Sequence, residues 1–362
     1  MIRITYNKDL GSLNTFGMKV KAACYVVYSE AGDLPQMDWD KLPQPILPLG
    51  SGSNILFTKD FPGTILHSDI KDIDIIEQRS RGDEVYVRAG SGVVFDDLCA
   101  WAASKQLWGI ENLSAIPGTV GASAVQNVGA YGVEAGDVID SVICYERSSG
   151  QFVTLNAEEC AFAYRDSIFK HQRGRYIVVS VVFRLTALLS PQLEYGHLRE
   201  AVERNIELMA PSTDPYPVLE PHAVAMPLSV KLVRDTVRII REEKLPDPAK
   251  VGSAGSFFKN PVLKRESFVE LCRIAAEAGR DKVPHFELED GNVKVPAAFL
   301  IEMCGFKGKK HGGAGVWEKQ PLVIVNASGD ASPDDILQLE NEIITAVNNK
   351  FGILLSPEVD HI

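Results

Sequence analysis

The chain has 362 residues, of which 45% are hydrophobic and 23% charged, which is typical of a soluble globular protein with two or three domains. Its net charge of −11 argues against a general nucleic-acid or membrane-surface binder, and no apolar run is long enough to span a bilayer. The N-terminus lacks a secretory-signal pattern, and the six scattered cysteines contain no CxxC motif. We therefore expect free thiols, a cytoplasmic location and no metal site.

The first half of the chain is predicted to be largely β with a few helices. Alternating apolar residues predict strands at 16–28, 85–89, 141–146 and 176–185, and helical spacing predicts a helix at 96–107. Residues 46–49 and 55–57 are predicted to be strands around the turn Gly50–Asn54, with the sequence GSGSN. The N–H groups of such a turn can form a nest for a phosphate, and a simple hairpin turn is the alternative.

A neutral Gly-rich segment, Ser114–Gly132, follows these elements. No charged residue occurs between Glu111 and Glu134, and small residues fill most of the segment. Glycine lets another group approach the backbone closely, so the segment suits binding to a large planar ligand. Simple packing under a sheet is the alternative.

The second half mixes helices and strands, which together with the first half indicates an α+β fold. Helices are predicted at 198–209, 228–245 and 296–304, with a further helix opened by a capping box at Ser267–Glu270 and closed by Gly279. Ser332 is predicted to cap the last helix, Gly352 to end it, and residues 322–326 to form a strand. Five prolines predict a long irregular loop at 210–227, within the expected domain boundary.

Three cations are candidates for binding or stabilising negative charge. Arg165 precedes an apolar strand and could stabilise developing charge, although pairing with Asp166 at the surface is the commoner role. Arg241 and Lys244 lie three residues apart near a helix end, where they could clamp an anion or complement the helix dipole.

Two further residues are candidates for acid chemistry. Ser256 lies in the loop sequence GSFFKNP, where it could expose its hydroxyl or bond its own backbone. No GxSxG motif accompanies it, so a hydrolase triad has no support. Glu358 follows the apolar residues 353–355, which suggest that this segment is docked on the protein.

Several segments together resemble the UDP-N-acetylenolpyruvoylglucosamine reductase family of flavoenzymes in peptidoglycan precursor synthesis. The matching segments, in chain order, are 49–57 (LGSGSNILF), 113–134 (LSAIPGTVGASAVQNVGAYGVE), 164–170 (YRDSIFK), 195–196, 244–248 (KLPDP), 255–261 (GSFFKNP), 296–314 and 356–359 (SPEV). The resemblance covers nearly the whole chain. The chain departs from the family pattern at Asp360, where a basic residue is usual, and in its longer Pro-rich loop.

The resemblance implies an α+β protein whose N-terminal FAD-binding region is of the vanillyl-alcohol-oxidase type in two subdomains. That region would cover 1–190 together with the tail 353–362, followed by a Tyr-bearing loop with a Pro-rich insertion at 191–231 and a C-terminal α+β substrate domain at 232–352. The implied FAD-binding residues are Gly50, Ser51, Gly52, Ser53 and Asn54 at the pyrophosphate, and Pro117, Gly118, Thr119, Gly121, Ala122, Asn127, Gly129 and Ala130 along the flavin and its linker.

The resemblance also implies the reaction and its residues. Ser256 would donate a proton, with Arg165 and Glu358 as its assistants. The implied substrate-binding residues are Tyr131, Tyr195, Arg241, Lys244 and Asn260. NADPH would reduce non-covalently bound FAD, which would reduce the enolpyruvyl group of a UDP-sugar. We expect a monomer without nucleic-acid or membrane partners; the alternatives are a flavin oxidase on the same fold and a non-catalytic nucleotide-sugar sensor.

Overall fold

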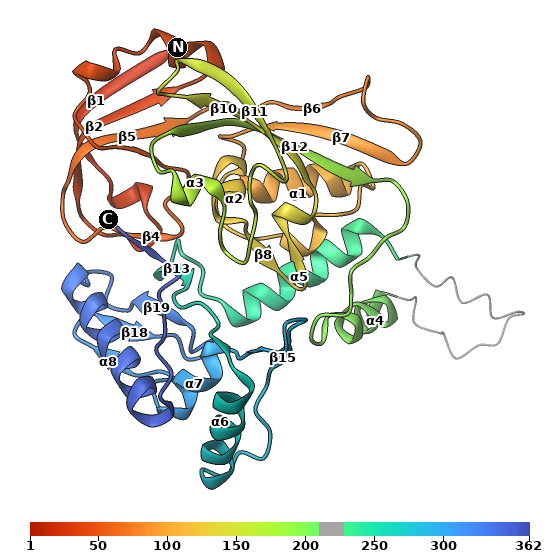
Figure 1. Ribbon diagram of the computed structural model, residues 1–362, viewed down its shortest axis with the longest axis vertical. Helices are drawn as coiled ribbons and strands as arrows, with labels where there is room; N and C mark the ends of the chain where they lie inside the picture. The colour runs from red at the N-terminus through yellow and green to blue at the C-terminus, as the bar shows by residue number, and fades with distance from the viewer. Residues whose placement is uncertain (210–227) are drawn as a thin grey trace, which may run out of the picture. The chain divides into compact units, whose positions relative to one another are not determined.

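The computed structural model describes residues 1–209 and 228–362, which form two compact units (Figure 1). Unit 1 comprises Met1–Thr5, Cys24–Gly50 and the described part of Gly63–Arg241, and unit 2 comprises Tyr6–Ala23, Ser51–Pro62 and Glu242–Ile362. Both units contain helices and strands, so the predicted α+β class is confirmed. The predicted Pro-rich loop lies outside the described residues. None of the helices in the described ranges is long and apolar enough to cross a membrane.

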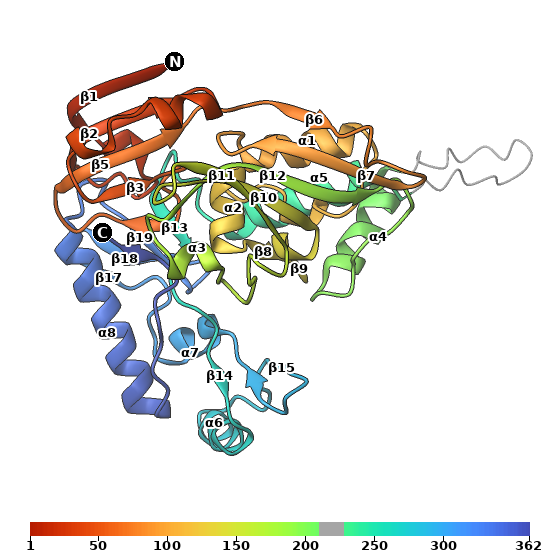
Figure 2. The same ribbon diagram turned by 45° about the horizontal axis from the view of Figure 1, so that its top comes forward.

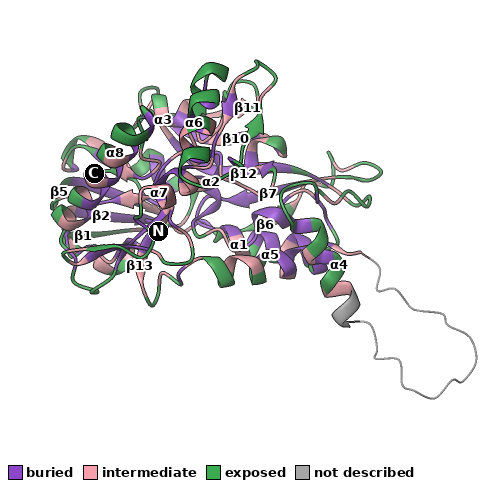
Figure 3. Cartoon of the chain, turned by 90° about the horizontal axis from the view of Figure 1, so that it is seen from below, coloured by how far each residue is buried: buried purple, intermediate pink, exposed green. Residues whose placement is uncertain are grey.

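An antiparallel sheet in the order β11-β10-β12-β7-β6 forms the centre of unit 1. Helices α1 and α2 pack on one of its faces, where Val87, Leu98 and Val120 share a single hydrophobic core (Figure 1). The β-branched strand β12 is almost entirely buried, which Figure 3 shows in purple. The elements are β6 Ile73–Ile75, β7 Glu84–Gly90, α1 Phe95–Ser104, α2 Val120–Gln126, β10 Ile139–Glu146, β11 Gln151–Asn156 and β12 Tyr176–Thr186.

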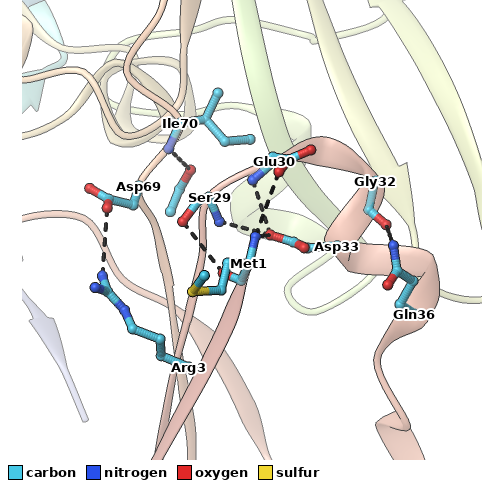
Figure 4. A network of polar contacts seen from close by, with 10 residues as sticks. Met1, Arg3, Ser29, Glu30, Gly32, Asp33, Gln36, Asp69 and Ile70 are labelled. Carbon is cyan, nitrogen blue, oxygen red and sulfur yellow. Dashed lines mark hydrogen bonds and ion pairs between the residues drawn. The ribbon is translucent and has the colours of Figure 1, made fainter.

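A second sheet has the strand order β1-β2-β5-β3, namely Ile2–Asp9, Lys21–Tyr28, Phe61–Ser68 and Ile46–Pro48. The predicted strand at 16–28 is shorter than expected, because Asn14 accepts a hydrogen bond from Met18 N and holds a turn there. Beside this sheet, Asp33 accepts hydrogen bonds from the Met1 ammonium at 2.7 Å and from Ser29 N at 2.9 Å (Figure 4). Short 3-10 helices cover Gly11–Leu13, Ala31–Gln36 and Trp39–Lys41.

The other elements of the described residues between 111 and 244 follow in chain order. They are the 3-10 helix Glu111–Leu113, β8 Gly129–Ala130, β9 Val133–Glu134, the 3-10 helix Ala135–Asp137, α3 Ile168–His171, α4 Leu198–Met209 and α5 Val230–Lys244. Helices α4 and α5 bury Leu198, Val202, Val233 and Val237 in a common cluster. Both helices are confirmed; the apolar spacing of 228–245 predicted α5, and 198–209 was predicted as a helix without such a pattern.

Unit 2 is built on a sheet in the order β13-β19-β18-β17, against which α8 packs (Figure 2). Ser332 and Asp335 form a capping box at the start of α8, and Gly352 ends it at a φ of +66°, as predicted. The bounds are β13 Gly252–Ser256, β17 Lys310–His311, β18 Ala314–Val316, β19 Val323–Asn326 and α8 Pro333–Phe351.

The rest of unit 2 consists of a small sheet, two helices and a docked C-terminal segment. These elements are β14 Val262–Leu263, β15 Phe286–Glu287, β16 Val293–Lys294, α6 Arg265–Glu277, α7 Ala297–Met303, β4 Ile55–Leu56 and β20 Asp360–His361. The predicted capping box at Ser267 is wrong, because α6 already begins at Arg265 with Lys264 as its N-cap. All six cysteines are free thiols, as predicted.

Candidate active site

The Gly-rich segment Ser114–Gly132 folds as a series of backbone turns around the short helix α2. Ala115, Gly118 and Asn127 have φ angles of +58°, +140° and +47°, and Thr119 caps α2 by accepting a hydrogen bond from Ala122 N. The helix was not predicted, because its sequence VGASAVQ is too small and neutral for an amphipathic pattern. The segment therefore presents backbone and small side chains, as expected for a cofactor-binding wall.

Gly50 joins the GSGSN turn to this wall. A Cβ atom at Gly50 would lie 2.7 Å from Thr119 Oγ1 and 3.2 Å from the Ala122 Cβ, closer than ordinary contacts. Only glycine fits at this position without displacing Thr119. Within unit 1, Gly50 therefore lies against Thr119 and Ala122, although these residues are far apart in sequence.

The rest of the turn, Ser51–Asn54, belongs to unit 2. Gly52 has a φ of +62°, and its carbonyl oxygen accepts a hydrogen bond from Thr15 N at 3.1 Å. Among the hydrogen bonds of residues 1–209 and 228–362, none is donated by the N–H of Ser51 or Gly52. The hairpin alternative is wrong, because β3 pairs in parallel with β5 and β4 pairs in parallel with β20.

Arg165 occupies a tight turn in which Ala163 and Asp166 exchange backbone hydrogen bonds of 3.1 and 3.0 Å. Its φ is +55°, and its Nη2 donates to the Gly129 carbonyl at 2.6 Å. The Asp166 carboxylate lies 2.7 Å from Nε2 of His171. The half-buried guanidinium is therefore held against the Gly-rich wall, where a substituent at Gly129 would lie 2.8 Å from Arg165 Nη1.

Tyr131, Tyr195 and Arg241 form a second group in unit 1. The rings of Tyr131 and Tyr195 meet edge to face with centroids 6.3 Å apart. Arg241 Nε donates to the Ala115 carbonyl at 3.2 Å. Burial lowers the pKa of Arg241 and raises the pKa of Tyr131. Through its hydrogen bond to Ala115 O, Arg241 supports the Gly-rich wall.

Lys244 and Asn260 lie in unit 2. Lys244 ends α5 with an exposed side chain, and its carbonyl accepts a hydrogen bond from Trp317 Nε1 at 3.1 Å. Asn260 Oδ1 accepts a hydrogen bond from Ala297 N at 2.9 Å and so caps the start of α7. The side-chain oxygen of Asn260 is therefore used by the fold, whereas its amide nitrogen is the group left for a ligand.

Ser256 and Glu358 lie on neighbouring segments of unit 2. Ser256 ends β13 after Gly255, whose φ is +71°, and within the described chain its Oγ makes no hydrogen bond. Glu358 N donates to Phe257 O at 2.8 Å, while Lys259 N donates to Ser356 O at 2.9 Å. The alternative of a serine bonded to its own backbone is therefore not observed.

The segment that follows Glu358 is docked, as predicted. Asp360 and His361 pair in parallel with Ile55 and Leu56, and Asp360 N donates to Asn54 O at 3.0 Å. Asn54 Nδ2 also donates to the Glu358 carbonyl at 3.2 Å. The GSGSN turn and the Glu358 segment are thus tied to each other.

Two polar groups that were not predicted from the sequence support these residues. Asn112 is fully buried and donates to the carbonyls of Tyr131 at 2.9 Å and Gln192 at 2.7 Å. Arg234 is 8% exposed and pairs with Asp96 at 3.0 Å. No local pattern marks either residue, because their partners are remote in sequence. Arg165 belongs to unit 1, whereas Ser256 and Glu358 belong to unit 2, so their convergence stays a prediction.

Two family models and several known proteins match this chain. A family model described as UDP-N-acetylenolpyruvoylglucosamine reductase, C-terminal domain, matches residues 247–362, and one described as FAD binding domain matches residues 39–156. The chain is 40% identical over 356 residues to UDP-N-acetylenolpyruvoylglucosamine reductase of Bacteroides fragilis, with 98% of each chain covered.

Two solved structures show the same fold. UDP-N-acetylenolpyruvylglucosamine reductase from Thermus caldophilus matches 100% of this chain and 98% of its own, with a TM-score of 0.62 and 21% identity. The 6-hydroxy-D-nicotine oxidase from Arthrobacter nicotinovorans matches 98% of this chain and 86% of its own, with a TM-score of 0.52 and 14% identity. The expected FAD-binding fold of the vanillyl-alcohol-oxidase type is therefore confirmed.

Proposed function

This chain belongs to the UDP-N-acetylenolpyruvoylglucosamine reductase family, and we propose from this premise that it forms UDP-N-acetylmuramate for peptidoglycan synthesis. It reduces the enolpyruvyl group of UDP-N-acetylglucosamine enolpyruvate, with NADPH as the hydride source and FAD as the carrier. The observation that carries this conclusion is the 40% identity to a reductase over 98% of the chain. The flavin-oxidase alternative leaves the match at residues 247–362 without a role.

The residues of the GSGSN turn and the Gly-rich wall fit FAD. Gly50 packs against Thr119 and Ala122 with no room for a side chain, and the N–H groups of Ser51 and Gly52 donate no hydrogen bond within the described residues. We propose that these groups hold the pyrophosphate and that residues 117–130 hold the flavin and its linker. Within that range Asn127 would contribute its backbone alone, because its side chain is bonded within the protein. Neither segment contains a His or Cys for covalent attachment, so the cofactor is held non-covalently. When bound, FAD supplies hydride transfer between NADPH and the substrate.

Arg165 is proposed to stabilise the negative charge that hydride addition creates on the enolpyruvyl carboxylate. A fixed cation at such a position lowers the barrier because it need not reorganise during the reaction. The hydrogen bond from its Nη2 to Gly129 O supports this role, since it restricts the guanidinium before substrate arrives.

Ser256 is proposed to deliver the proton to the substrate carbon, with Glu358 as a hydrogen-bonding assistant. A proton donor must lie within hydrogen-bond reach of the reacting atom and must not be engaged elsewhere. The Ser256 hydroxyl meets the second condition within the described residues. We propose that Tyr131, Tyr195, Lys244 and the Asn260 amide hold the UDP-sugar, with Lys244 on its diphosphate. Arg241 contributes by holding the Ala115 carbonyl of the Gly-rich wall.

The test is to purify the protein, record its visible absorption and follow NADPH oxidation with the enolpyruvyl UDP-sugar. We expect a yellow protein that consumes NADPH only when the UDP-sugar is present. Oxygen consumption without NADPH would favour an oxidase, and a colourless protein that binds the UDP-sugar would favour a sensor. A yellow protein that leaves NADPH unoxidised would contradict the proposal.

We also propose that the enzyme acts as a monomer in the cytoplasm, without nucleic-acid or membrane partners. Six free thiols, four of them buried, suit a reducing compartment. Light scattering on the purified protein would measure the oligomeric state.

A further inference from the structure

Asn127 connects three parts of unit 1 through its side chain alone. It is 1% exposed and ends α2 in the left-handed conformation, with a φ of +47°. Its Oδ1 accepts from Gly136 N at 2.8 Å, and its Nδ2 donates to Glu134 Oε2 at 2.8 Å and to Ala163 O at 2.9 Å. An asparagine amide has two N–H donors, so both of them are used within the protein.

These contacts fix the geometry around Arg165. Ala163 is the first residue of the turn that carries Arg165, and the Ala163 carbonyl held by Asn127 also accepts the hydrogen bond from Asp166 N that closes this turn. Two residues after Asn127, Gly129 O accepts the hydrogen bond from Arg165 Nη2. Asn127 therefore sets the distance between the base of the turn and the acceptor of the guanidinium.

Gly129 leaves space for this arrangement. A Cβ atom there would lie 2.8 Å from Arg165 Nη1 and 2.9 Å from Glu134 Cγ. The Glu134 side chain, which Asn127 also holds, thus lies against the same glycine as the guanidinium. One buried amide orders both side chains around this position.

We propose that Asn127 is a positioning residue that acts on catalysis by fixing Arg165. Its amide is bonded to Gly136, Glu134 and Ala163, so only its backbone is left for the FAD-binding role that the resemblance implies. The proposal rests on the role of Arg165 in the proposed function. A purely structural Asn127 would lower stability and leave the reaction of the folded enzyme unchanged.

Two variants test the proposal. Asn127→Asp keeps the acceptor for Gly136 N but turns the donor group into an oxygen that faces Ala163 O and Glu134. Asn127→Gly removes all three hydrogen bonds and tolerates the positive φ, so it serves if the first variant fails to fold. We expect reduction of the flavin by NADPH to be unchanged and its reoxidation by the enolpyruvyl UDP-sugar to slow roughly 10- to 100-fold, as misplaced catalytic groups do.

Asn326→Ala is the matched control. Asn326 is also buried, and its amide donates to Phe16 O at 3.0 Å while its Oδ1 accepts from Ala331 N at 3.0 Å. This control is expected to lose stability with both half-reactions unchanged. In an Arg165→Ala background, Asn127→Asp should slow reoxidation by less than about twofold, because its effect passes through Arg165. A full additional loss in that background, or equal slowing of both half-reactions, would overturn the proposal.

A readout without turnover separates this inference from the proposed function. The ¹H–¹⁵N signal of the Arg165 guanidinium, assigned by its loss in Arg165→Lys, should shift in Asn127→Asp and stay in place in Asn326→Ala. An unmoved signal in the folded Asn127→Asp protein overturns the positioning role. If the wild-type protein fails to oxidise NADPH with the UDP-sugar, the proposed function fails while this signal still decides the role of Asn127.

Discussion

Arg165 in unit 1 and Ser256 in unit 2 are held by different means. The guanidinium of Arg165 is bonded to Gly129 O, and its turn is bonded to the buried side chain of Asn127. Around Ser256 the order comes from backbone pairing, with β13 against β19 and Phe257 O accepting from Glu358 N. The Oγ of Ser256 makes no hydrogen bond in the described chain.

The difference has a consequence for mutagenesis. Where a side chain holds the structure, its replacement changes both stability and the geometry of its neighbours. Where the backbone holds the structure, a surface-facing hydroxyl can be removed while the segment keeps its place. Substitutions around Arg165 in unit 1 should therefore lower the free energy of unfolding. Substitution of Ser256 should lower the reaction rate and leave the free energy of unfolding unchanged.

The largest effect is expected for Ser256→Ala, which removes the proposed proton donor. Reoxidation of the reduced flavin by the UDP-sugar should slow by about 100-fold or more, equivalent to roughly 3 kcal/mol, by analogy with the loss of an oxyanion-hole donor. Flavin reduction by NADPH and the unfolding free energy should be unchanged. Stopped-flow absorbance measures both half-reactions; equal slowing of the two would show that Ser256 is not the donor.

In contrast to Ser256→Ala, Gly129→Ala in unit 1 should lower the free energy of unfolding. The added methyl would lie 2.8 Å from Arg165 Nη1 and 3.1 Å from Val133 O, so it displaces the guanidinium and costs about 1–3 kcal/mol of stability. Denaturant unfolding checks the stability. Gly32→Ala is the control, because a Cβ there meets no atom within 4 Å. Equal stability of the two variants would show that a substitution at Gly129 does not act through the fold of unit 1.

Much of the fold is predictable from local sequence. The apolar spacing of α5 and the Ser332 and Gly352 signals of α8 are local, so both helices follow from short windows. The capping box expected at Ser267 fails because residues 265–266 already belong to α6, which a Ser-x-x-Glu pattern cannot reveal. Helix α2 lacks an amphipathic pattern, since it is buried among other elements and needs no polar face.

The site is predictable only where motifs carry it. The GSGSN turn, the Gly-rich wall and GSFFKNP are recognisable motifs, and the candidate residues within them were predicted from the sequence. Asn112 and the side-chain role of Asn127 were not predicted, because each amide donates to a carbonyl remote in sequence, that of Gln192 at 80 residues and that of Ala163 at 36. A buried amide with remote partners leaves no local pattern. The convergence of Arg165 with Ser256 and Glu358 stays a prediction.

Substitution of His361 tests whether the docked C-terminal segment of unit 2 depends on an ion pair as well as on backbone pairing. Its Nε2 lies 3.2 Å from Oε2 of the buried Glu340 on α8, and this contact raises the pKa of His361. A raised pKa in the folded state means that the stabilisation is complete below the unfolded pKa of about 6.5 and is lost as pH rises through the folded value. His361→Gln should therefore cost about 1–2 kcal/mol at pH 5.5 and less at pH 9.

Denaturant unfolding of the full chain at the two pH values measures this difference. Lys19→Gln is the control for general charge effects, because Lys19 pairs with Asp330 at an exposed position. A His361→Gln cost that does not change with pH would show that the ring contact with Phe257, with centroids 6.1 Å apart, holds the segment instead of the ion pair.

The smallest effect is expected at the start of α8, which lies outside the proposed chemistry. Ser332 Oγ accepts a hydrogen bond from Asp335 N at 3.2 Å, so Ser332→Ala should cost about 1 kcal/mol, whereas Ser332→Asn keeps a side-chain acceptor and should cost only a few tenths. Both half-reactions should keep their rates, because backbone pairing positions Ser256 without this cap. A slower reoxidation in Ser332→Ala, at equal flavin content, would mean that α8 transmits strain to β13. The position of Ser256 would then depend on side-chain contacts as well as on backbone pairing.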